Sequence, residues 1–426
     1  MKILLIGSGA REHALARSLA QAGADLVVAP GNPGTAALAE NRAVEAADPA
    51  AVTALAREVG ADLVVVGPEA PLVAGVADAV RAAGIPVFGP DAAAARLEGS
   101  KAFAKDVMAA AGVPTAMAHV CTTLAEVEAA VDAFGAPYVI KDDGLAAGKG
   151  VVVTSDRVEA LAHAAACLAR TDDEARAVVV EEFLDGPEVS LFCLSDGTSV
   201  VPLEPAQDFK RIGEGDTGPN TGGMGAYSPL DWAPDGLVDE VVARVAQPTI
   251  EELARRGAPF VGLLYCGLAL TSRGLRVIEF NARFGDPETQ VVLARLRSPL
   301  DEALLAAATG RLDQVELTWD AGSAVTVVVA APGYPEGAVT GGTITGVEAA
   351  EELDDVWVLH AGTARDADGE LVSSGGRVLS VVGAGATLAQ ARGAAYAGVE
   401  RIGLADARVR RDIALAAERG EVEVPG

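Results

Sequence analysis

A run of polar residues at the end of an apolar strand carries the most informative chemistry of this sequence. Glu279, Asn281 and Arg283 alternate within residues 277–290, so their side chains are expected on one face of a strand. A carboxylate and an amide hold a hard cation through oxygen ligands. A guanidinium beside them supplies positive charge where a phosphoryl group is transferred. The arrangement suits magnesium-bound ATP, although the same spacing alone fits a strand end whose polar residues only cap the sheet.

Lysines gather in the middle of a chain whose default cation is arginine. Lys101, Lys105, Lys141, Lys149 and Lys210 all lie between positions 100 and 211. A compact, flexible ammonium group is useful at nucleotide phosphates. We expect Lys141 and Lys149, which flank a glycine loop, to serve there. We expect Lys105 to be a solvated surface lysine.

The glycine loop lies between two apolar segments. Gly148, Lys149 and Gly150 precede a β-branched run at 151–153, and this composition predicts a flap that closes over phosphates. It is not a Walker A loop, because no Ser or Thr follows Lys149 and the next segment reads as a strand. A hairpin turn is the alternative, although a hairpin requires neither three glycines nor two lysines.

A kinked connection between two strands follows at 178–190. Such a connection is able to present backbone groups to an adenine base, and Glu188 beyond it would hold ribose hydroxyls. The residues expected at the base are Glu181, Glu182, Phe183 and Leu184. Alone, this segment carries no specific signal.

The first hundred residues alternate short apolar strands with alanine-rich helical segments. Strands are expected at 3–6, 26–29, 63–66 and 87–88. This rhythm predicts a parallel sheet with crossover helices. Ligands of such sheets bind at the carboxyl ends of the strands, where this chain carries glycine-rich and proline-rich turns.

The first of these turns, residues 7–9, looks like a dinucleotide fingerprint, but two features argue against an NAD site. Glu12 stands where a third glycine belongs, and the second strand ends at 29–30 without an acid for a ribose hydroxyl. Backbone N–H groups and a helix N-terminus for a single phosphate remain, with Arg11 close by. A purely structural strand-to-helix turn is the alternative.

The bulk properties describe a globular, multidomain protein. Its 426 residues are enough for two to four domains, and 50% hydrophobic with 22% charged residues is ordinary for folded chains. A net charge of -27 argues against nucleic acid as a partner. No apolar run suits a membrane span or a signal peptide, and the four cysteines show no disulfide or zinc spacing. We expect a soluble, cytoplasmic protein.

The last hundred residues return to strands. Runs at 324–331 and 375–382 predict a small α+β domain that closes the site. The arginines within 408–411 are expected on the solvated face of a C-terminal helix.

The order of these features resembles the ATP-grasp fold, in which two α+β subdomains clamp magnesium-bound ATP. Over nearly its full length the chain also resembles the phosphoribosylamine–glycine ligase family. The matching runs are 7–14, 67–72, 143–150, 219–229 and 279–290. The run Asn-Thr-Gly-Gly-Met-Gly-Ala-Tyr-Ser-Pro, which starts at position 220, is highly specific.

The resemblance implies three domains. An N-terminal α/β domain with an open parallel sheet is expected over 1–100. An ATP-grasp α+β core of two subdomains is expected over 101–321, with its lid subdomain at about 115–187. A small α+β C-terminal domain is expected over 322–426.

The resemblance also implies the reaction. An ATP-dependent carbon–nitrogen ligase of de novo purine biosynthesis would join glycine to 5-phosphoribosylamine through glycyl phosphate, with magnesium or manganese. It would release glycinamide ribonucleotide, ADP and phosphate. No protein nucleophile is needed, because the enzyme neutralises charge and aligns the reactants. A closing lid is expected, since an acyl phosphate hydrolyses in open water, and the candidates are the glycine loop and the loop at 213–225.

The family match assigns roles to several sets of residues. Those expected at ATP are Lys101, Lys141, Gly148, Lys149, Gly150, Glu181, Glu182, Phe183, Leu184 and Glu188. Those expected at the metal are Glu279 and Asn281, and those expected to assist the chemistry are Arg283, Lys149 and Asn281. Those expected at the substrates are Gly7, Ser8, Gly9, Arg11, Glu69, Asp208, Lys210, Asn220, Thr221, Gly222, Gly223, Asp286 and Pro287.

Several positions depart from the family pattern. Phe209 stands where histidine is more frequent, which puts in doubt an acid–base role for that position. Ala282 stands where cysteine is more frequent, and Ala10 replaces a glycine but leaves the first turn feasible. The strand at 264–270 lacks the metal carboxylate that many ATP-grasp enzymes carry there, so metal binding would depend on the later strand.

Two other functional classes stay open. Another ATP-grasp carboxylate–amine ligase, or a purine-pathway carboxylase or formate-using transformylase, is disfavoured by the run at 220–229. A regulatory nucleotide-binding module would not need Glu279, Asn281 and Arg283 together. The expected partners are glycine and 5-phosphoribosylamine, with transient contacts to neighbouring purine-pathway enzymes. The expected state is a monomer or a weak dimer.

Overall fold

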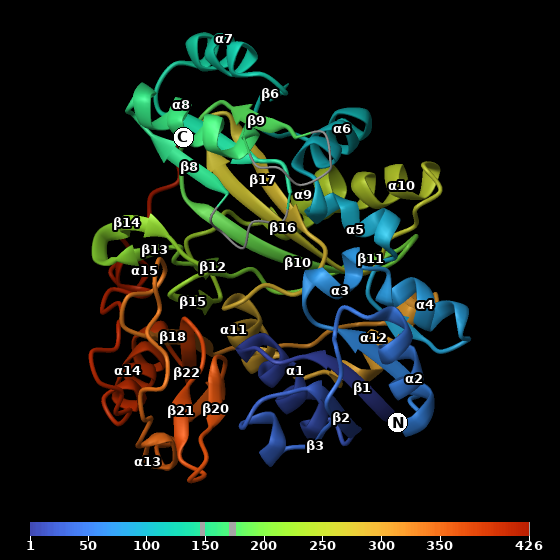
Figure 1. Ribbon diagram of the computed structural model, residues 1–426. Helices are drawn as coiled ribbons and strands as arrows, with labels where there is room; N and C mark the ends of the chain where they lie inside the picture. The colour runs from blue at the N-terminus through green and yellow to red at the C-terminus, as the bar shows by residue number, and fades with distance from the viewer. Residues whose placement is uncertain (145–149, 170–175, 426) are drawn as a thin grey trace.

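The computed structural model describes residues 1–144, 150–169 and 176–425. Within them the chain builds an N-terminal parallel sheet, a central antiparallel sheet, a lid sheet and a C-terminal sheet (Figure 1). This architecture confirms the predicted fold class. Gly148 and Lys149 of the predicted flap lie outside the described residues. No helix in the described part is long and apolar enough to cross a membrane.

The first sheet is parallel and has the strand order β3-β2-β1-β4-β5. Four of its strands are those expected from the apolar runs. The strands are β1 (Lys2–Gly7), β2 (Asp25–Pro30), β3 (Glu40–Asn41), β4 (Leu63–Val66) and β5 (Val87–Phe88). The helices are α1 (Ala10–Gln21), η1 (Thr35–Ala37), α2 (Pro49–Val59), α3 (Glu69–Val73), α4 (Val76–Ala82) and α5 (Ala92–Gly99).

Side-chain alternation along β1 divides the packing of this sheet into two faces. Leu4 and Ile6 pack in one cluster with residues of α2 and α4. Ile3 and Leu5 pack in another with residues of α1 and of α12 (Leu300–Ala308). Each buried leucine or isoleucine stabilises the fold by roughly 2 kcal/mol. The first sheet therefore depends on a helix that lies far away in the sequence.

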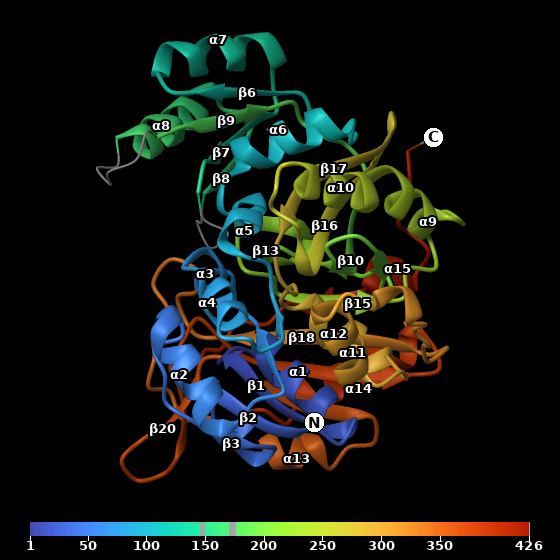
Figure 2. The ribbon, with the colours of Figure 1, turned by 90° about the vertical axis from the view of Figure 1, so that its right-hand side faces the viewer.

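The central sheet is antiparallel and has the order β11-β10-β16-β17, and the lid sheet has the order β6-β9-β7-β8. Figures 1 and 2 both place the lid above the central sheet, away from the N-terminal domain. The central strands are β10 (Glu188–Asp196), β11 (Val200–Pro202), β16 (Val261–Thr271) and β17 (Gly274–Asn281). The lid elements are β6 (Ala118–Cys121), α7 (Leu124–Phe134), β7 (Tyr138–Asp142), β8 (Val151–Thr154), α8 (Arg157–Leu168) and β9 (Val178–Glu181). The other helices of this part are α6 (Lys101–Ala111), α9 (Leu237–Val241), η3 (Val242–Ala246), α10 (Gln247–Arg255) and η4 (Leu312–Gln314).

The C-terminal sheet combines strands from two predicted domains. Its order is β12-β15-β18-β22-β19, and β12 and β15 precede the predicted boundary at 321. The strands are β12 (Gln207–Asp208), β15 (Gly225–Ser228), β18 (Ser323–Ala330), β19 (Val356–His360) and β22 (Arg377–Gly385). Two hairpins, four α-helices and one 3-10 helix flank it: β13 (Arg211–Gly213), η2 (Glu214–Asp216), β14 (Thr217–Asn220), α11 (Glu288–Arg295), α13 (Val347–Glu351), β20 (Thr363–Arg365), β21 (Leu371–Ser373), α14 (Leu388–Val399) and α15 (Leu415–Glu418). The predicted domain boundaries themselves stay predictions.

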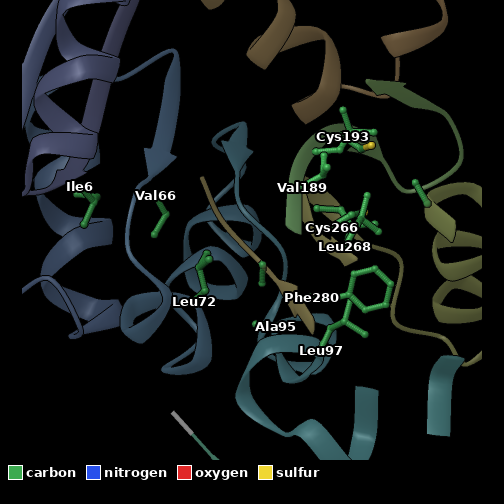
Figure 3. Packing of buried hydrophobic residues seen from close by; sticks show 14 of the residues in the cluster. Ile6, Val66, Leu72, Ala95, Leu97, Val189, Cys193, Cys266, Leu268 and Phe280 are labelled. Carbon is green, nitrogen blue, oxygen red and sulfur yellow. The ribbon is translucent and has the colours of Figure 1, made fainter. Parts of the chain in front are cut away.

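One apolar cluster joins the first sheet to the central sheet (Figure 3). Phe280 is only 3% exposed within this cluster. Because side chains alternate along a strand, its neighbours Glu279 and Asn281 point to the other face of β17. The labelled members of the cluster are Ile6, Val66, Leu72, Ala95, Leu97, Val189, Cys193, Cys266, Leu268 and Phe280.

The expected C-terminal helix at 408–411 is wrong, because these residues belong to no helix. Arg408 and Arg411 are exposed as expected, but Arg410 is only 1% exposed. Its guanidinium pairs with Asp216 at 2.7 Å and with Asp412 at 2.6 Å, and it lies 5.0 Å from the ring of Phe209. A run of charges is usually solvated, but two carboxylates and an aromatic ring compensate the buried charge of Arg410.

Two buried histidines join the N-terminal and C-terminal sheets. The backbone N–H of His360 donates to Nδ1 of His13 at 2.8 Å, and Asn32 donates to the carbonyl of His360 at 2.9 Å. Burial, followed by the charges of His360 and Arg17, lowers the pKa of His13 to about 3. Burial and the charge of Arg365 lower the pKa of His360 to about 4. Both imidazoles are therefore neutral at pH 7.

Acidification is expected to weaken the fold once the pH falls below the pKa of a free imidazole. An unfolded histidine takes up a proton near pH 6.5, but the folded chain resists until about pH 4 or 3, so the stabilisation is complete above pH 6.5 and is lost below it. Each histidine contributes up to about 1.4 kcal/mol of unfolding free energy per pH unit. Urea unfolding between about pH 7 and about pH 5 measures this slope. His13→Asn keeps an acceptor for His360 and should flatten it, and an unchanged slope would contradict the assignment.

Candidate active site

A cavity of about 880 Å³ opens between the lid, the central sheet and the N-terminal and C-terminal domains, termed the outer domains. Its size falls within the range of enclosed ligand sites. Every described residue predicted for ATP or the metal lies in its wall. From the predicted substrate residues it includes Arg11, Glu69, Asp208, Lys210, Asn220, Thr221, Gly222 and Asp286.

The strand β17 positions the predicted metal ligands. It pairs with β16 so that Glu279 lies opposite Gly267 and Asn281 lies opposite Tyr265. The pairing shifts between Gly267 and Leu268, which marks an irregularity beside the two ligands. The alternation predicted from the sequence therefore places a carboxylate and an amide together at the cavity.

Cations surround the carboxylate of Glu279. Burial alone would raise its pKa, but Lys210, Lys141, Lys101 and Arg283 together hold the pKa of Glu279 below its usual value. The carboxylate is therefore charged at neutral pH. A charged oxygen ligand is what a hard divalent cation requires.

Acidic groups crowd the adjoining wall. Burial and the charges of Glu288, Glu188 and Glu279 raise the pKa of Asp208 to about 8, although Lys210 opposes this shift. Lys210 pairs with Glu188 at 2.5 Å. The excess of carboxylates over lysine at this point favours an additional cation.

The oxygen ligands at the cavity suit Mg²⁺ only if ATP completes the coordination. Among the described residues, no three histidine, cysteine or acidic side chains come together closely enough to hold a metal alone. Glu279 and Asn281 offer two oxygen ligands at the cavity. Mg²⁺ is usually held by one or two carboxylates together with substrate phosphates and water, so these residues fit a metal that arrives with ATP.

Arg283 is engaged with two carboxylates. Its guanidinium lies 2.9 Å from Glu98 and 3.3 Å from Glu69, and it donates to Oδ1 of Asn281 at 3.3 Å. Although burial opposes it, Glu98 and Glu69 raise the pKa of Arg283. The arginine therefore stays charged and holds the side chain of a predicted metal ligand.

A buried ion network lies under the predicted phosphate site. Glu181 is 3% exposed and pairs with Lys141 at 2.9 Å and with Lys105 at 3.1 Å. Lys141 also donates to the carbonyl of Ile278 at 2.9 Å, directly before the metal ligand. The expectation of a solvated Lys105 is wrong, because Glu181 from a separate strand provides a buried partner. Glu181 therefore fixes the positions of Lys141 and Lys105 in the cavity wall.

The flap edges are described, although its centre is not. Lys101 begins α6 and donates to the carbonyl of Gly144 at 3.0 Å. Asp143 accepts the N–H of Ala102 at 3.1 Å, which ties the flap to the same helix. Gly150 lies in the cavity wall. The predicted roles of Gly148 and Lys149 stay predictions.

The predicted adenine connection lies between β9 and β10. Glu182 accepts the N–H of Met117 at 3.0 Å and pairs with Arg273 at 3.0 Å, which holds the connection in place. Phe183 is 45% exposed, and both Phe183 and Leu184 line the cavity. Within the described residues, no hydrogen bond uses the backbone of Phe183 or Leu184, so these groups remain for a ligand.

The first glycine turn differs in detail from the predicted phosphate cradle. Glu12 is 1% exposed, accepts the N–H of Gly9 at 2.6 Å and accepts from Arg11 at 2.5 Å. A Cβ at Gly7 or Gly67 would collide with Glu12. A resident carboxylate thus occupies one amide predicted for the phosphate. Gly7, Ser8 and Gly9 are absent from the cavity wall, whereas Arg11 belongs to it.

The loop at 220–223, termed the substrate loop, is held by an arginine that sequence reasoning missed. Arg377, which begins β22, donates to the carbonyl of Asp286 at 2.7 Å and of Gly222 at 2.5 Å. It also lies 3.3 Å from the carboxylate of Asp286. Burial opposes it, but Arg377 and Arg11 lower the pKa of Asp286. Gly223 adopts a φ of +106°, and a Cβ there would collide with Pro287.

Arg377 and Glu98 carry no local sequence signal. Arg377 follows two glycines at the start of an apolar strand, and Glu98 lies near the end of an alanine-rich helix. Only the fold brings them to the cavity, from the C-terminal and N-terminal domains. Two flanking domains therefore complete a site whose centre belongs to the lid and the central sheet.

Models of phosphoribosylglycinamide synthetase match most of the chain. The N domain matches residues 1–98, the ATP-grasp (A) domain matches residues 99–289 and the C domain matches residues 324–416. Enzymes of the ATP-grasp type use ATP and a divalent metal, which agrees with the composition of the cavity wall.

Relatives and solved structures agree with these matches. The phosphoribosylamine–glycine ligase of Streptomyces coelicolor is 65% identical over 97% of this chain and 99% of that protein, and the one of Mycobacterium tuberculosis is 59% identical over 100% of both. The crystal structure of phosphoribosylamine–glycine ligase from Thermotoga maritima has a TM-score of 0.84 and 32% identity, over 97% of this chain and 100% of that chain. A biotin carboxylase domain of Hydrogenobacter thermophilus 2-oxoglutarate carboxylase shares the fold, with a TM-score of 0.72 and 17% identity over 96% of this chain and 91% of that chain. The chain belongs to the phosphoribosylamine–glycine ligase family, also described as phosphoribosylglycinamide synthetase.

Proposed function

We propose that this protein joins glycine to 5-phosphoribosylamine with the use of ATP, in de novo purine biosynthesis. The products are glycinamide ribonucleotide, ADP and phosphate. The observation that carries the proposal is the single cavity in which metal-type ligands, lysines and two arginines of the outer domains converge. The family membership supports the same reaction.

The carboxylate of glycine is a poor electrophile and has to be activated before an amine attacks it. Glycine's carboxylate attacks the γ-phosphate of ATP to give glycyl phosphate, and the amine of phosphoribosylamine then displaces phosphate. Lys141 and Lys101 offset phosphate charge, and Arg283 keeps Asn281 oriented toward the reacting groups. Mg²⁺, held by Glu279 and Asn281, would supply further charge neutralisation at the phosphates. Closure of a lid over the cavity would limit hydrolysis of the acyl phosphate.

The sugar phosphate is assigned to the end of the cavity beside the outer domains. Arg11 and Arg377 both line the cavity there. The charges of both arginines lower the pKa of Asp286. Since Glu12 already uses the N–H of Gly9, the two guanidinium groups are the main anion partners. Gly9 then acts indirectly, because its N–H fixes the carboxylate of Glu12 that pairs with Arg11. The roles of Gly7 and Ser8 stay predictions.

The reaction is tested by omission. ADP release is followed with glycine, phosphoribosylamine and Mg²⁺ each left out in turn, and the ligated product is identified by mass spectrometry. Release that needs all components and gives the ligated product supports the proposal. Formation of ADP with bicarbonate or formate in place of glycine would instead favour a carboxylase or transformylase.

Arg377→Met is expected to raise the KM for phosphoribosylamine about tenfold or more, because one charge-assisted contact to the phosphate is lost. The KM for ATP should stay within about twofold, since this arginine lies at the other end of the cavity. Arg365→Met is the matched control, because Arg365 belongs to the same domain and, among the described residues, donates only to the carbonyl of Gly369 at 2.8 Å. An ATP-selective defect of Arg377→Met would move the nucleotide to the outer domains.

Three further expectations belong to the proposal. We expect the protein to lie in the cytoplasm and to be a monomer or weak dimer. We also expect transient contacts to neighbouring purine-pathway enzymes. Sedimentation velocity across a range of concentrations measures the state of association. A stable higher oligomer would contradict it.

A further inference from the structure

Residues 410–425 cross from the C-terminal sheet to the central part of the molecule and are termed the strap. In Figures 1 and 2 the red chain rises past α15 along the central sheet toward the lid side. Ala416, Ala417 and Val422 of the strap lie in the cavity wall. None of the roles assigned above involves these residues.

One end of the strap is fixed to the β13–β14 hairpin, which also lines the cavity. Four polar contacts of 2.7 to 3.1 Å connect the two segments. They join the Arg410 side chain to Asp216 and to the carbonyl of Arg211, the N–H of Gly215 to Asp412, and the N–H of Arg411 to Glu214. The strap therefore has a defined starting point beside the substrate loop.

The other end lies against the adenine connection. Pro425 Cδ is 3.3 Å from the position that a Cβ of Gly186 would take. Val424 packs against the main apolar cluster, and Val422 is half-buried. Glu421 and Glu423 are exposed, so the segment alternates valines inward and glutamates outward as an extended chain does.

Val422 shares a cavity wall with unused backbone groups of the adenine connection. Phe183 and Leu184 belong to the same cavity wall and, among the described residues, their backbone groups have no hydrogen-bond partner. Unpaired backbone donors and acceptors beside an apolar side chain suit a flat heterocycle with polar edges. The triphosphate would lie farther along, toward Lys141 and Glu279.

We propose that the strap forms the outer wall of the nucleoside end of the ATP site, and that Val422 packs against the bound nucleoside. The C-terminal domain thereby determines nucleotide affinity as well as closing the substrate end. This inference rests on the proposed placement of ATP in the cavity. Its chemistry is apolar contact with the nucleoside, without contact to the phosphates.

The test compares two probes in calorimetric titrations of the full chain. Val422→Asp is expected to raise the Kd of MgADP about tenfold or more, because a carboxylate replaces an apolar contact and repels the nucleotide. The Kd of inorganic tripolyphosphate with Mg²⁺ should change by less than about threefold, since that probe lacks the nucleoside. The KM for glycine should also stay unchanged. Glu423→Ala, at the adjacent outward position, is the matched control and should alter none of these values.

Val422→Ala removes most of the apolar contact without adding or moving a charge. It is expected to show the same selective loss of MgADP affinity while retaining tripolyphosphate binding. Unchanged MgADP affinity in both variants, or equal losses for both probes, would overturn the role of the strap. Failure of the unaltered protein to bind MgADP would instead reject the placement of ATP itself, so the two ideas fail separately.

Discussion

Turnover of the Glu279→Gln variant is expected to fall by at least about two orders of magnitude. The side chain keeps its shape but loses the charge that the neighbouring lysines stabilise. A neutral amide is a weaker ligand for a hard cation, so less metal charge would be present to offset the negative charge of the transferring phosphoryl group. Steady-state release of ADP at saturating ATP, glycine and phosphoribosylamine measures the effect.

Glu204→Gln is the matched control for this substitution. Glu204 pairs with Arg295 at 3.4 Å and does not belong to the cavity wall formed by the described residues. Its replacement should leave turnover within about twofold. A magnesium titration of Glu279→Gln then separates weaker metal affinity from lost charge in the transition state. Near-normal turnover of this variant in saturating magnesium would sink the metal assignment.

Much of the fold was accessible from the sequence because its strands are short apolar runs bounded by turns. The strands at 3–6 and 63–66 are local patterns, and their parallel pairing follows from the intervening helices. The contact of α12 with the first sheet is different. Its residues from Leu300 onward match an amphipathic helix, but no local signal indicates which surface it covers.

The residues of the site likewise fall into those that a local pattern predicts and those that depend on a distant partner. Alternation is a local property, so it predicted that Glu279 and Asn281 share a face. The burial of Lys105 depends on Glu181, which arrives from another strand, and the sequence alone therefore suggested the wrong environment. Arg377 likewise reaches the cavity only because β22 begins beside the substrate loop. Residues whose role depends on a distant partner were the ones missed.

Arg283→Met is expected to reduce kcat/KM by at least about 100-fold and also to lower the melting temperature. The variant leaves the carboxylates of Glu98 and Glu69 without their common partner, at a position where each lies within 3.3 Å of the guanidinium. Glu98 also accepts the N–H of Ala282 at 2.7 Å, so the turn after the metal strand loses support. Differential scanning calorimetry and the ADP-release assay measure the two effects.

The two effects have different causes and are separable. Glu98→Gln in the Arg283→Met background removes one unpaired charge, so it should restore part of the melting temperature while activity stays low. Arg295→Met provides the matched control, since Arg295 is also largely buried but donates to Ser228 and to the carbonyl of Gly322, away from the cavity. That variant should lose stability yet keep its kcat. Recovery of full activity together with the melting temperature in the double variant would show that Arg283 only neutralises its two carboxylates, and the charge at the phosphates would then have to come from the lysines alone.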